Sequence, residues 1–581
     1  MSKKIKLNYK QKLIATNRYL ILDNHRKPRE NVEDMFTRIS KFVATNEKRY
    51  QLSKKDIKNL TENFYKIQSN FEFLSGFTLS DRGRNKLMAA CYVLPLHDSL
   101  ESIYKTLYQA VRLHRLGAGI GYDFSEIRPE CSLIKSTGKE ASGPISFMRL
   151  YDFSSEIILN RGSVRHAGHM GILRIDHPDI QKFIRAKENY NQLTNFNLSV
   201  AVTDKFIKAY KNNKNYKLKH PKFNQNIELS ARNILKSIAK SIHKSGEPGI
   251  IFIDEINRKN TLPKLDKIKA TNLCGEQPLL SYEACNLGSI ALNKFLQENK
   301  SSNITKKIDW KRLERVIRLA VRFLDNTIDI AHYELPEIKQ IVCKDNRKIG
   351  LGVMGWADLL SKLSIPYDSN KALKLAEKIM RFIQEKSREE SCNLGKLKGN
   401  FNNFKKSIFP KLGYKYMRNA TITTIAPTGT ISLFADCNGG IEPFFSLSYV
   451  RKNMETLGDK KLVFINKYLE KKLKEEWVYS KNLMKEIIKK GNIQKIKEIP
   501  GEIKSIFKTA LEINPIWHLK MQASFQKYTD NSVSKTINLP ENTDTEKIEK
   551  ILIKAYELNL KGVTIYRNKS RDKQVLNLKN K

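Results

Sequence analysis

The sequence contains the stretch Asn272-Leu273-Cys274-Gly275-Glu276-Gln277-Pro278-Leu279, followed by Glu283-Ala284-Cys285-Asn286-Leu287-Gly288. Its first cysteine, Cys274, stands two residues from both an amide and a carboxylate. A neighbouring negative charge disfavours a thiolate, so Cys274 does not fit the usual nucleophile, which needs a cationic partner. A cysteine that carries a hydrogen atom needs no thiolate, and the Glu276 carboxylate can then act as a base. Other motifs in the sequence are needed to decide whether Cys274 is a nucleophile or a hydrogen-atom carrier.

The composition indicates a globular chain of 581 residues. It contains no run of about 18 apolar residues that could span a membrane, and its start, Met1-Ser2-Lys3-Lys4-Ile5-Lys6, lacks the apolar part of a signal peptide. We therefore expect a cytoplasmic protein with no membrane contact. Its seven cysteines predict reduced thiols rather than a disulfide framework. No Cys-x-x-Cys pair or Cys/His cluster with zinc spacing occurs, so no metal site is predicted.

The formal net charge of +45 raises the question of nucleic-acid binding. The lysines are dispersed through every segment and accompany abundant Asn and Ile, and no recognisable nucleic-acid-binding module is present. We therefore expect no nucleic acid as the main partner. A basic chain still attracts smaller anions such as nucleotides.

The sequence predicts two regions. Residues 1–85 are expected to form a helical N-terminal region, because amphipathic periodicity begins near Asn31 and continues from Tyr50 to Gln68. From residue 86 to 581, short apolar runs alternate with helical segments, which favours a large α/β assembly with parallel strands. Expected strands include 90–94, 119–124, 169–174, 196–200, 421–425, 534–539 and 562–566. A Lys/Glu-rich helical insertion is expected near 455–510.

Several motifs extend the pattern of the first stretch along the chain. Asn272-x-Cys274-x-Glu276, Cys285-Asn286-Leu287-Gly288 and Ala426-Pro427-Thr428-Gly429-Thr430-Ile431-Ser432 together resemble the catalytic (large) subunit of ribonucleotide reductases, and most closely its adenosylcobalamin-dependent class II branch. The resemblance covers nearly the whole chain, in the right order. It includes residues 90–95, 117–129, 142–148, 170–180, 440–443, 535–540 and 561–567.

The resemblance implies a ten-stranded α/β barrel of two half-barrels, with a central finger loop that carries Cys274 at its tip. As a radical, Cys274 would abstract the 3′-hydrogen of a ribonucleotide. Glu276 would accept the 3′-hydroxyl proton, and Asn272 would orient the ribose. Cys91 and Cys285 would supply two electrons and become a disulfide. Cys131, Cys343, Cys392 and Cys437 match no catalytic position, and we expect them to be buried structural thiols.

The same resemblance implies a substrate site. The segment Pro427, Thr428, Gly429, Thr430 and Ile431 is a strand-to-helix turn that would hold the phosphates. Gly119 would line the ribose pocket, and Ala90, Leu273 and Gly275 are also expected to bind the substrate. The family commonly has Asn-Ser-Pro-Thr-Leu at a second phosphate segment, whereas this chain has Ser75-Gly76-Phe77-Thr78-Leu79. The hydroxyl expected at Gly76 is missing, so either Ser75 or Thr78 replaces it or the contact is lost.

A second nucleotide site, for dNTP or ATP effectors, is also implied. Asp98 matches the acidic residue that contacts the effector's deoxyribose. Lys135 lies in the first effector loop, and Arg161 and Arg165 lie in the second, which passes between effector and substrate. His166 stands where many relatives have a second arginine, so the effector code is expected to differ.

Three observations favour adenosylcobalamin as the radical source. The oxygen-dependent branch uses paired tyrosines near the C-terminus, whereas Tyr566 is followed by Arg567. No glycyl-radical motif occurs, and the eleven-residue step from Cys274 to Cys285 is typical of the cobalamin branch. We expect ribonucleoside diphosphates as substrates, thioredoxin or glutaredoxin as reductant, and a homodimer. The sequence has no C-terminal cysteine pair that would re-reduce Cys91 and Cys285.

Three alternatives stay open at this point. The chain could be an oxygen-dependent class I catalytic subunit that needs a metal-bearing radical partner. It could be a non-catalytic nucleotide-binding homologue, although such a protein would not need Asn272, Cys274, Glu276, Cys91 and Cys285 together. The third alternative is a basic nucleic-acid-binding protein, which predicts a strongly salt-dependent affinity for DNA.

Overall fold

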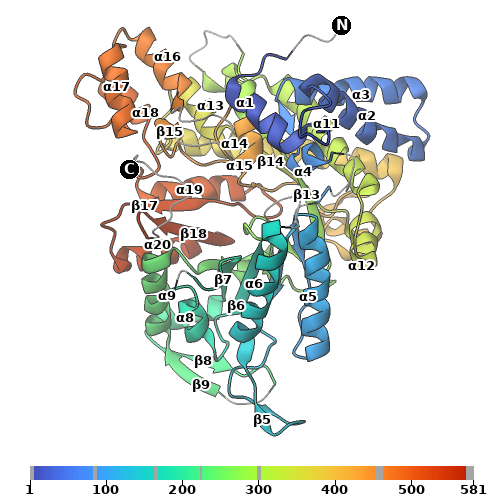
Figure 1. Ribbon diagram of the computed structural model, residues 1–581, viewed down its shortest axis with the longest axis vertical. Coiled ribbons are helices and arrows are strands. Elements are labelled where there is room, and N and C mark those ends of the chain that lie inside the picture. Colours follow the sequence, from blue (N-terminus) through green and yellow to red (C-terminus); the bar gives the residue numbers. More distant parts are fainter. Residues whose placement is uncertain are drawn as a thin grey trace.

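The computed structural model describes residues 5–82, 88–89, 91–161, 168–189, 191–222, 226–297, 303–451 and 462–570. Its N-terminal part is helical, with α1 (Tyr9–Ile14), α2 (Val32–Thr45) and α3 (Lys54–Ser69) gathered at one end of the molecule (Figure 1). Helix α2 begins where predicted, because Asn31 and Asp34 cap each other's backbone N–H groups in a capping box. Its apolar face packs on α3 and on α11 (Trp310–Ile330).

The first half of the barrel consists of parallel strands in the order β2, β3, β6, β7, β10. Helices connect these strands, as parallel pairing requires. The strands are β2 (Cys91–Val93), β3 (Gly119–Asp123), β6 (His169–Arg174), β7 (Phe196–Val202) and β10 (Gly249–Phe252). The principal helices are α5 (Leu100–Arg115), α6 (Gly143–Arg161), α7 (Ile180–Arg185), α8 (Asp204–Lys211), α9 (Ala231–Ser245) and α10 (Ile253–Arg258). Two hairpins accompany them, β4 (Leu133–Ile134) with β5 (Lys139–Glu140), and β8 (Asn215–Lys219) with β9 (Asn226–Ser230).

The second half repeats this parallel arrangement. β13 (Ala284–Ala291) pairs with β14 (Ile349–Met354), and β17 (Thr536–Leu539) pairs with β18 (Gly562–Arg567). Residues 421–425, predicted as a strand, lie between the two pairs and form the parallel bridges Leu351↔Thr423 and Ile425↔Val533. Further backbone hydrogen bonds run along both edges, for example from the Thr424 N–H to the Leu351 carbonyl at 3.0 Å and from the Ser534 N–H to the Ile425 carbonyl at 2.8 Å. A short strand, β1 (Phe73–Leu74), adds to the edge of β13.

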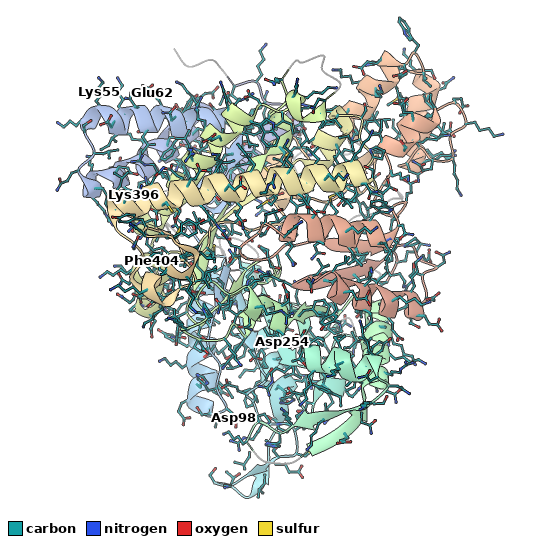
Figure 2. All side chains as sticks on the ribbon, turned by 180° about the vertical axis from the view of Figure 1, so that it is seen from behind. Lys55, Glu62, Asp98, Asp254, Lys396 and Phe404 are labelled. Carbon is teal, nitrogen blue, oxygen red and sulfur yellow. The ribbon has the colours of Figure 1, made fainter. Side chains whose placement is uncertain are left out.

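Two antiparallel junctions close the ring, because β2 pairs with β13 and β10 pairs with β18. The predicted fold class, an α/β barrel of two half-barrels preceded by helices, is therefore confirmed. The remaining helices of this half are α4 (Gly76–Ser80), α12 (Pro336–Gln340), α13 (Trp356–Lys362), α14 (Asn370–Lys398), α15 (Gly429–Phe434), α19 (Pro515–Gln526) and α20 (Thr545–Glu557). Helix α14 runs across the back of the molecule (Figure 2). In the described part of the chain, no helix is long and apolar enough to cross a membrane.

A further helical unit contains the hairpin β15 (Ser448–Arg451) with β16 (Leu462–Ile465), then α16 (Lys467–Glu475), α17 (Lys481–Lys490) and α18 (Gly501–Ile506). Leu469, Leu473 and Ile487 belong to an apolar cluster of its own, separate from the main core. The unit lies at one corner of the molecule, away from the barrel strands (Figure 1). The boundaries predicted for the regions, at 85/86 and near 455–510, stay predictions.

A hairpin passes inside the barrel, made of β11 (Ala270–Thr271) and β12 (Pro278–Leu279). Two glycines on the barrel wall allow its close approach. A Cβ on Gly121 of β3 would stand 1.8 Å from the Thr271 carbonyl oxygen, and a Cβ on Gly350 of β14 would stand 2.8 Å from Nε2 of Gln277. The hairpin can therefore approach the barrel wall this closely only because Gly121 and Gly350 have no side chains.

We predict that Gly121→Ala displaces the hairpin. A methyl group at 1.8 Å from a backbone carbonyl cannot be accommodated by a side-chain rotation, so the protein should lose about 2 kcal/mol or more of stability. Gly501→Ala is the matched control, since a Cβ there meets nothing within 4 Å. Thermal unfolding measures both variants, and equal midpoints would contradict the close approach.

Candidate active site

The turn of the hairpin, residues 272–277, is held by its own backbone and by one side chain. The Asn272 N–H donates to the Gln277 carbonyl at 3.1 Å, and the Gly275 N–H donates to the Asn272 carbonyl at 3.1 Å. The Gln277 N–H donates to Oδ1 of Asn272 at 3.0 Å. Gly275 has a φ of +78°, and a Cβ on it would meet nothing within 4 Å. The tip therefore projects into open space, and Cys274 is exposed there.

Both half-barrels anchor this turn. Asn197, on β7, donates from Nδ2 to the Leu273 carbonyl at 2.9 Å. On the other side, the Glu276 carbonyl accepts from Oγ1 of Thr424 at 2.9 Å and from the Ser532 N–H at 3.0 Å. No sequence motif had pointed to Asn197 or Ser532 for this purpose. Their contacts fix the backbone on either side of Cys274.

The structure brings the five predicted catalytic residues together. Cys91 and Cys285 are direct partners in the antiparallel pair β2–β13, and both are buried free thiols. Facing residues of such a pair have Cα atoms about 4.5–5.5 Å apart, which is within the range that a disulfide spans. Asn272 links this pair to the finger loop, with Nδ2 2.9 Å from Sγ of Cys91. Cys91 also lies close enough to Cys274 and Glu276 to feel their charges.

Burial controls the protonation of these groups. It raises the pKa of the Cys91 thiol well above its usual value, and the negative charge of Glu276 raises it further. Burial likewise raises the pKa of Cys285. Both thiols therefore keep their protons at neutral pH. Burial raises the pKa of Glu276 to about 7, and its Oε2 has no hydrogen-bond partner among the described residues. A carboxyl of this kind can either take up or release a proton near neutral pH.

The two predicted phosphate segments also meet. A Cβ on Gly76 would stand 3.2 Å from Cγ2 of Ile431, so the starts of α4 and α15 are adjacent. The predicted replacement hydroxyls are already engaged, because Oγ of Ser75 bonds to Oγ1 of Thr78 at 2.9 Å and donates to the Leu287 carbonyl at 2.8 Å. Oγ1 of Thr428 accepts from the Gly440 N–H at 2.8 Å. The N–H groups at the starts of the two helices are therefore available as donors to a phosphate, together with the Thr428 hydroxyl, whose hydrogen its contact with Gly440 does not use.

The other predicted substrate-binding residues lie beside Cys91 and Cys274. Gly119 is the parallel partner of Cys91 on the neighbouring strand. Leu273 and Gly275 flank Cys274 on the finger loop, and Leu273 packs against the backbone at Gly168, where an added Cβ would stand 3.4 Å from Cδ1 of Leu273. Ala90 lies outside the described residues.

The predicted effector residue Asp98 lies at a different end of the molecule, where Figure 2 labels it. Nε of Arg128 donates to the Asp98 carboxylate at 2.8 Å, and Nζ of Lys222 is 2.5 Å from it. Burial would raise the pKa of Asp98, but these hydrogen bonds outweigh it and hold the pKa below its usual value. Lys135 is exposed in the turn between β4 and β5. The Arg161 side chain, Arg165 and His166 lie outside the described residues.

The other cysteines differ from their prediction. Cys131 is exposed rather than buried, and Cys343, Cys392 and Cys437 are partly buried. Cys131 adopts a left-handed conformation with a φ of 62° beside the β4–β5 hairpin, where no core covers it. In the described part of the chain, no group of three or more His, Cys, Asp or Glu side chains could hold a metal ion.

Comparison with known proteins agrees with this geometry. The family described as "Ribonucleotide reductase, barrel domain" matches residues 89–566, and "Ribonucleotide reductase, all-alpha domain" matches residues 5–77. The chain therefore belongs to the large-subunit family of ribonucleotide reductases.

Individual members of this family show which ribonucleotide reductases the chain is similar to. The chain is 40% identical over 576 residues to the vitamin B12-dependent ribonucleoside-diphosphate reductase of Mycobacterium tuberculosis (strain CDC 1551 / Oshkosh), covering 98% of this chain and 81% of the relative. The enzyme of the same name from Thermoplasma acidophilum is 43% identical, over 88% of this chain and 66% of the relative. The class Id ribonucleotide reductase alpha subunit of Actinobacillus ureae has the same fold, with a TM-score of 0.78 at 24% identity and 97% coverage of both chains.

The raised pKa of Glu276 has a consequence for stability. An unfolded chain ionises this carboxyl near 4.5, whereas the folded protein keeps the proton up to about pH 7. Between these values the folded state binds more protons, so its free energy of unfolding falls as pH rises. Glu276→Gln has no such titration. We predict that it gains roughly 3 kcal/mol over the wild type between about pH 4 and about pH 8.

Thermal or denaturant unfolding across this pH range measures the difference. Glu62→Gln is the control, because Glu62 lies on the exposed face of α3, away from the barrel interior (Figure 2). If Glu276→Gln and the wild type differ by the same amount at every pH, the carboxyl does not titrate in the way described.

Proposed function

We propose that this chain reduces ribonucleoside diphosphates to 2′-deoxyribonucleotides for DNA synthesis, with adenosylcobalamin as the radical source. The observation that carries the proposal is the facing pair Cys91 and Cys285, joined through Asn272 to a finger loop that exposes Cys274. Relatives named vitamin B12-dependent ribonucleoside-diphosphate reductases support the substrate and the cofactor.

The proposed chemistry uses each group in the state that its surroundings favour. Cys274, as a thiyl radical, takes the 3′-hydrogen of the ribose, and Glu276 takes the 3′-hydroxyl proton. A buried, protonated thiol of the pair Cys91 and Cys285 protonates the departing 2′-hydroxyl, which leaves as water. The pair delivers two electrons and becomes a disulfide, and Cys274 returns the hydrogen atom to C3′.

The other predicted residues would hold the substrate in place for this reaction. Asn272 would hydrogen-bond the ribose, and Ala90, Gly119, Leu273 and Gly275 would border it. The phosphates would bind at the start of α15, at Pro427, Thr428, Gly429, Thr430 and Ile431, next to Ser75 and Thr78. Hydrogen-atom transfer depends steeply on distance, so the anchoring of the finger loop by both half-barrels serves the reaction directly.

The surroundings of Cys274 fit a cobalamin-derived radical source. When bound, adenosylcobalamin supplies a 5′-deoxyadenosyl radical. Its target must be accessible from outside the finger loop, and Cys274 is exposed beside the open space at Gly275. The position after Tyr566 is Arg567, whose Nε and Nη1 donate to the carbonyls of His243 and Glu541 at 2.9 Å. A relay through paired tyrosines therefore has no second member at this place.

We also propose a second copy of the chain, effector nucleotides and a protein reductant as partners. Helices α5 and α6 lie side by side (Figure 1). Exposed apolar side chains line both helices, a pattern that marks an interaction surface and supports a homodimer. They are Leu100, Tyr104, Tyr108, Phe153 and Ile157. Effector nucleotides, dNTP or ATP, would bind near Asp98, Lys135, Arg161 and Arg165. Thioredoxin or glutaredoxin would reduce the disulfide, and the reaction would take place in the cytoplasm.

We predict that Cys274→Ser abolishes deoxynucleotide formation, with a loss of at least a thousandfold, because serine cannot carry the hydrogen atom. Substrate affinity should change by less than about twofold. Turnover is measured with adenosylcobalamin and dithiothreitol, with and without oxygen. Cys131→Ser, at an exposed thiol outside the barrel interior, is the control and should stay active. Activity in Cys274→Ser, or turnover that requires a metal-bearing partner subunit, would overturn the proposal.

A further inference from the structure

A cavity of about 1040 Å³ lies between α10, α14, α19 and the turn before β18. Thr421, where the barrel segment 421–425 starts, lines a narrow pocket that shares Thr261 and Lys561 with this cavity, whereas Pro427 of the proposed phosphate turn follows the other end of that segment. The cavity's lining includes neither Asp98 nor that residue's partners Arg128 and Lys222, so the cavity is also distinct from the proposed effector site. Its volume is in the range of cavities that bind small organic ligands.

The lining of this cavity carries an excess of positive charge. Six lining side chains are lysine or arginine and three are carboxylates. The carboxylates are already paired, for example Asp530 with Arg388 at 2.8 Å and Glu377 with Lys527 at 2.9 Å. Within the described ranges, no carboxylate lies within ion-pair distance of Lys259, and the buried Lys561 donates only to backbone carbonyls. Burial of Lys561 lowers its pKa to about 8.

The floor of the cavity narrows to a pocket of about 10 Å³ lined by Thr261, Thr421, Asn531 and Lys561. Each of these residues is at most 4% exposed. Oγ1 of Thr261, Oγ1 of Thr421 and Nδ2 of Asn531 have no hydrogen-bond partner in the part of the chain that the structure describes. Nε of Arg388, also at the cavity, has none either. All four atoms can donate a hydrogen bond, and a buried donor left unpaired destabilises the fold.

The same floor connects to the finger loop. Oδ2 of Asp530 accepts from the N–H groups of Ile422 and Thr423 at 3.0 and 3.3 Å. One residue beyond Asn531, the Ser532 N–H holds the Glu276 carbonyl at 3.0 Å. Pro278, at the base of the finger loop, lines the narrow pocket itself. A molecule bound here would therefore contact the segment that fixes Glu276.

We propose that this cavity binds a phosphate-bearing small molecule, with phosphate oxygens accepting from Thr261 and Arg388 beside Lys259, and that its binding stabilises the segment 530–532 and the finger loop. Convergent unpaired donors with uncompensated cations are the chemistry that recognises a phosphate. The effect on the finger loop rests on the proposed function, whereas the binding itself does not.

The binding experiment uses the full chain without cofactor or substrate, titrated calorimetrically at low salt with inorganic phosphate, pyrophosphate or ATP. The substrate and effector sites are also expected to bind such anions, so the comparison between variants isolates this site. Lys259→Gln and Thr261→Val should each weaken one binding event at least tenfold. Lys264→Gln, at an exposed lysine outside the cavity lining, is the control and should not. Equal affinities for pyrophosphate and ATP would identify the diphosphate as the recognised group, and binding of ATP alone would identify a nucleotide.

Identical titrations for the wild type and both cavity variants would overturn the proposal and would mean that only water fills the site. Because the Lys259 side chain is exposed, its replacement tests the proposal even if Thr261→Val fails to fold. Hydrogen exchange supplies the second readout. Amides of 270–279 and 529–533 should slow on binding in the wild type and in Lys264→Gln, and not in Lys259→Gln. The binding experiment does not depend on ribonucleotide reduction. Failure of phosphate binding in the cavity can therefore be told apart from failure of the proposed reductase activity.

Discussion

The antiparallel pairing of β2 with β13 is the constraint on which the rest of the site depends. It is one of two junctions that close the half-barrels into a ring, and it sets Cys91 directly opposite Cys285. The same closure leaves an interior just wide enough for the hairpin of β11 and β12, which fits because Gly121 and Gly350 have no side chains. The register of the β2–β13 pair thus fixes the distance between the thiols of Cys91 and Cys285. It also fixes the place where the Cys274 thiol can approach them.

Burial then gives the enclosed groups their chemical character. Cys91 and Cys285 lie in the core of the barrel, where the loss of water favours the neutral thiol over the thiolate. The same loss of water brings the pKa of Glu276 to about 7, so one environment produces both proton donors and a group that can accept a proton. Cys274 differs because the hairpin carries it out of this environment to an exposed tip. The division between buried reductant and accessible hydrogen-atom carrier follows from the path of the backbone.

The barrel and its five central residues were predicted through the family resemblance, whose motifs mark the strand ends and the finger loop; the alternation of apolar runs and helices alone predicted only a large α/β assembly. The sequence could not predict contacts made between distant segments. Arg128 and Lys222 engage Asp98 across 30 and 124 residues of chain, and only Arg128 lay within a quoted motif. Residues 421–425 have a strand-like pattern and form backbone hydrogen bonds along both edges, although each edge contains a single isolated bridge, at Thr423 and at Ile425. The burial predicted for Cys131 was wrong because exposure depends on the packing around a turn. The unpaired donors of Thr261 and Asn531 appear only when the helices surrounding them are in place.

The central claim is that the facing thiols of β2 and β13 supply the electrons. A single turnover tests it most directly, with equal amounts of chain, adenosylcobalamin and ribonucleoside diphosphate, and no added reductant. Thiols are then blocked and the peptides are mapped by mass spectrometry. The account predicts about one deoxynucleotide per chain and a disulfide between Cys91 and Cys285. Product formed while both cysteines are recovered as free thiols would contradict it.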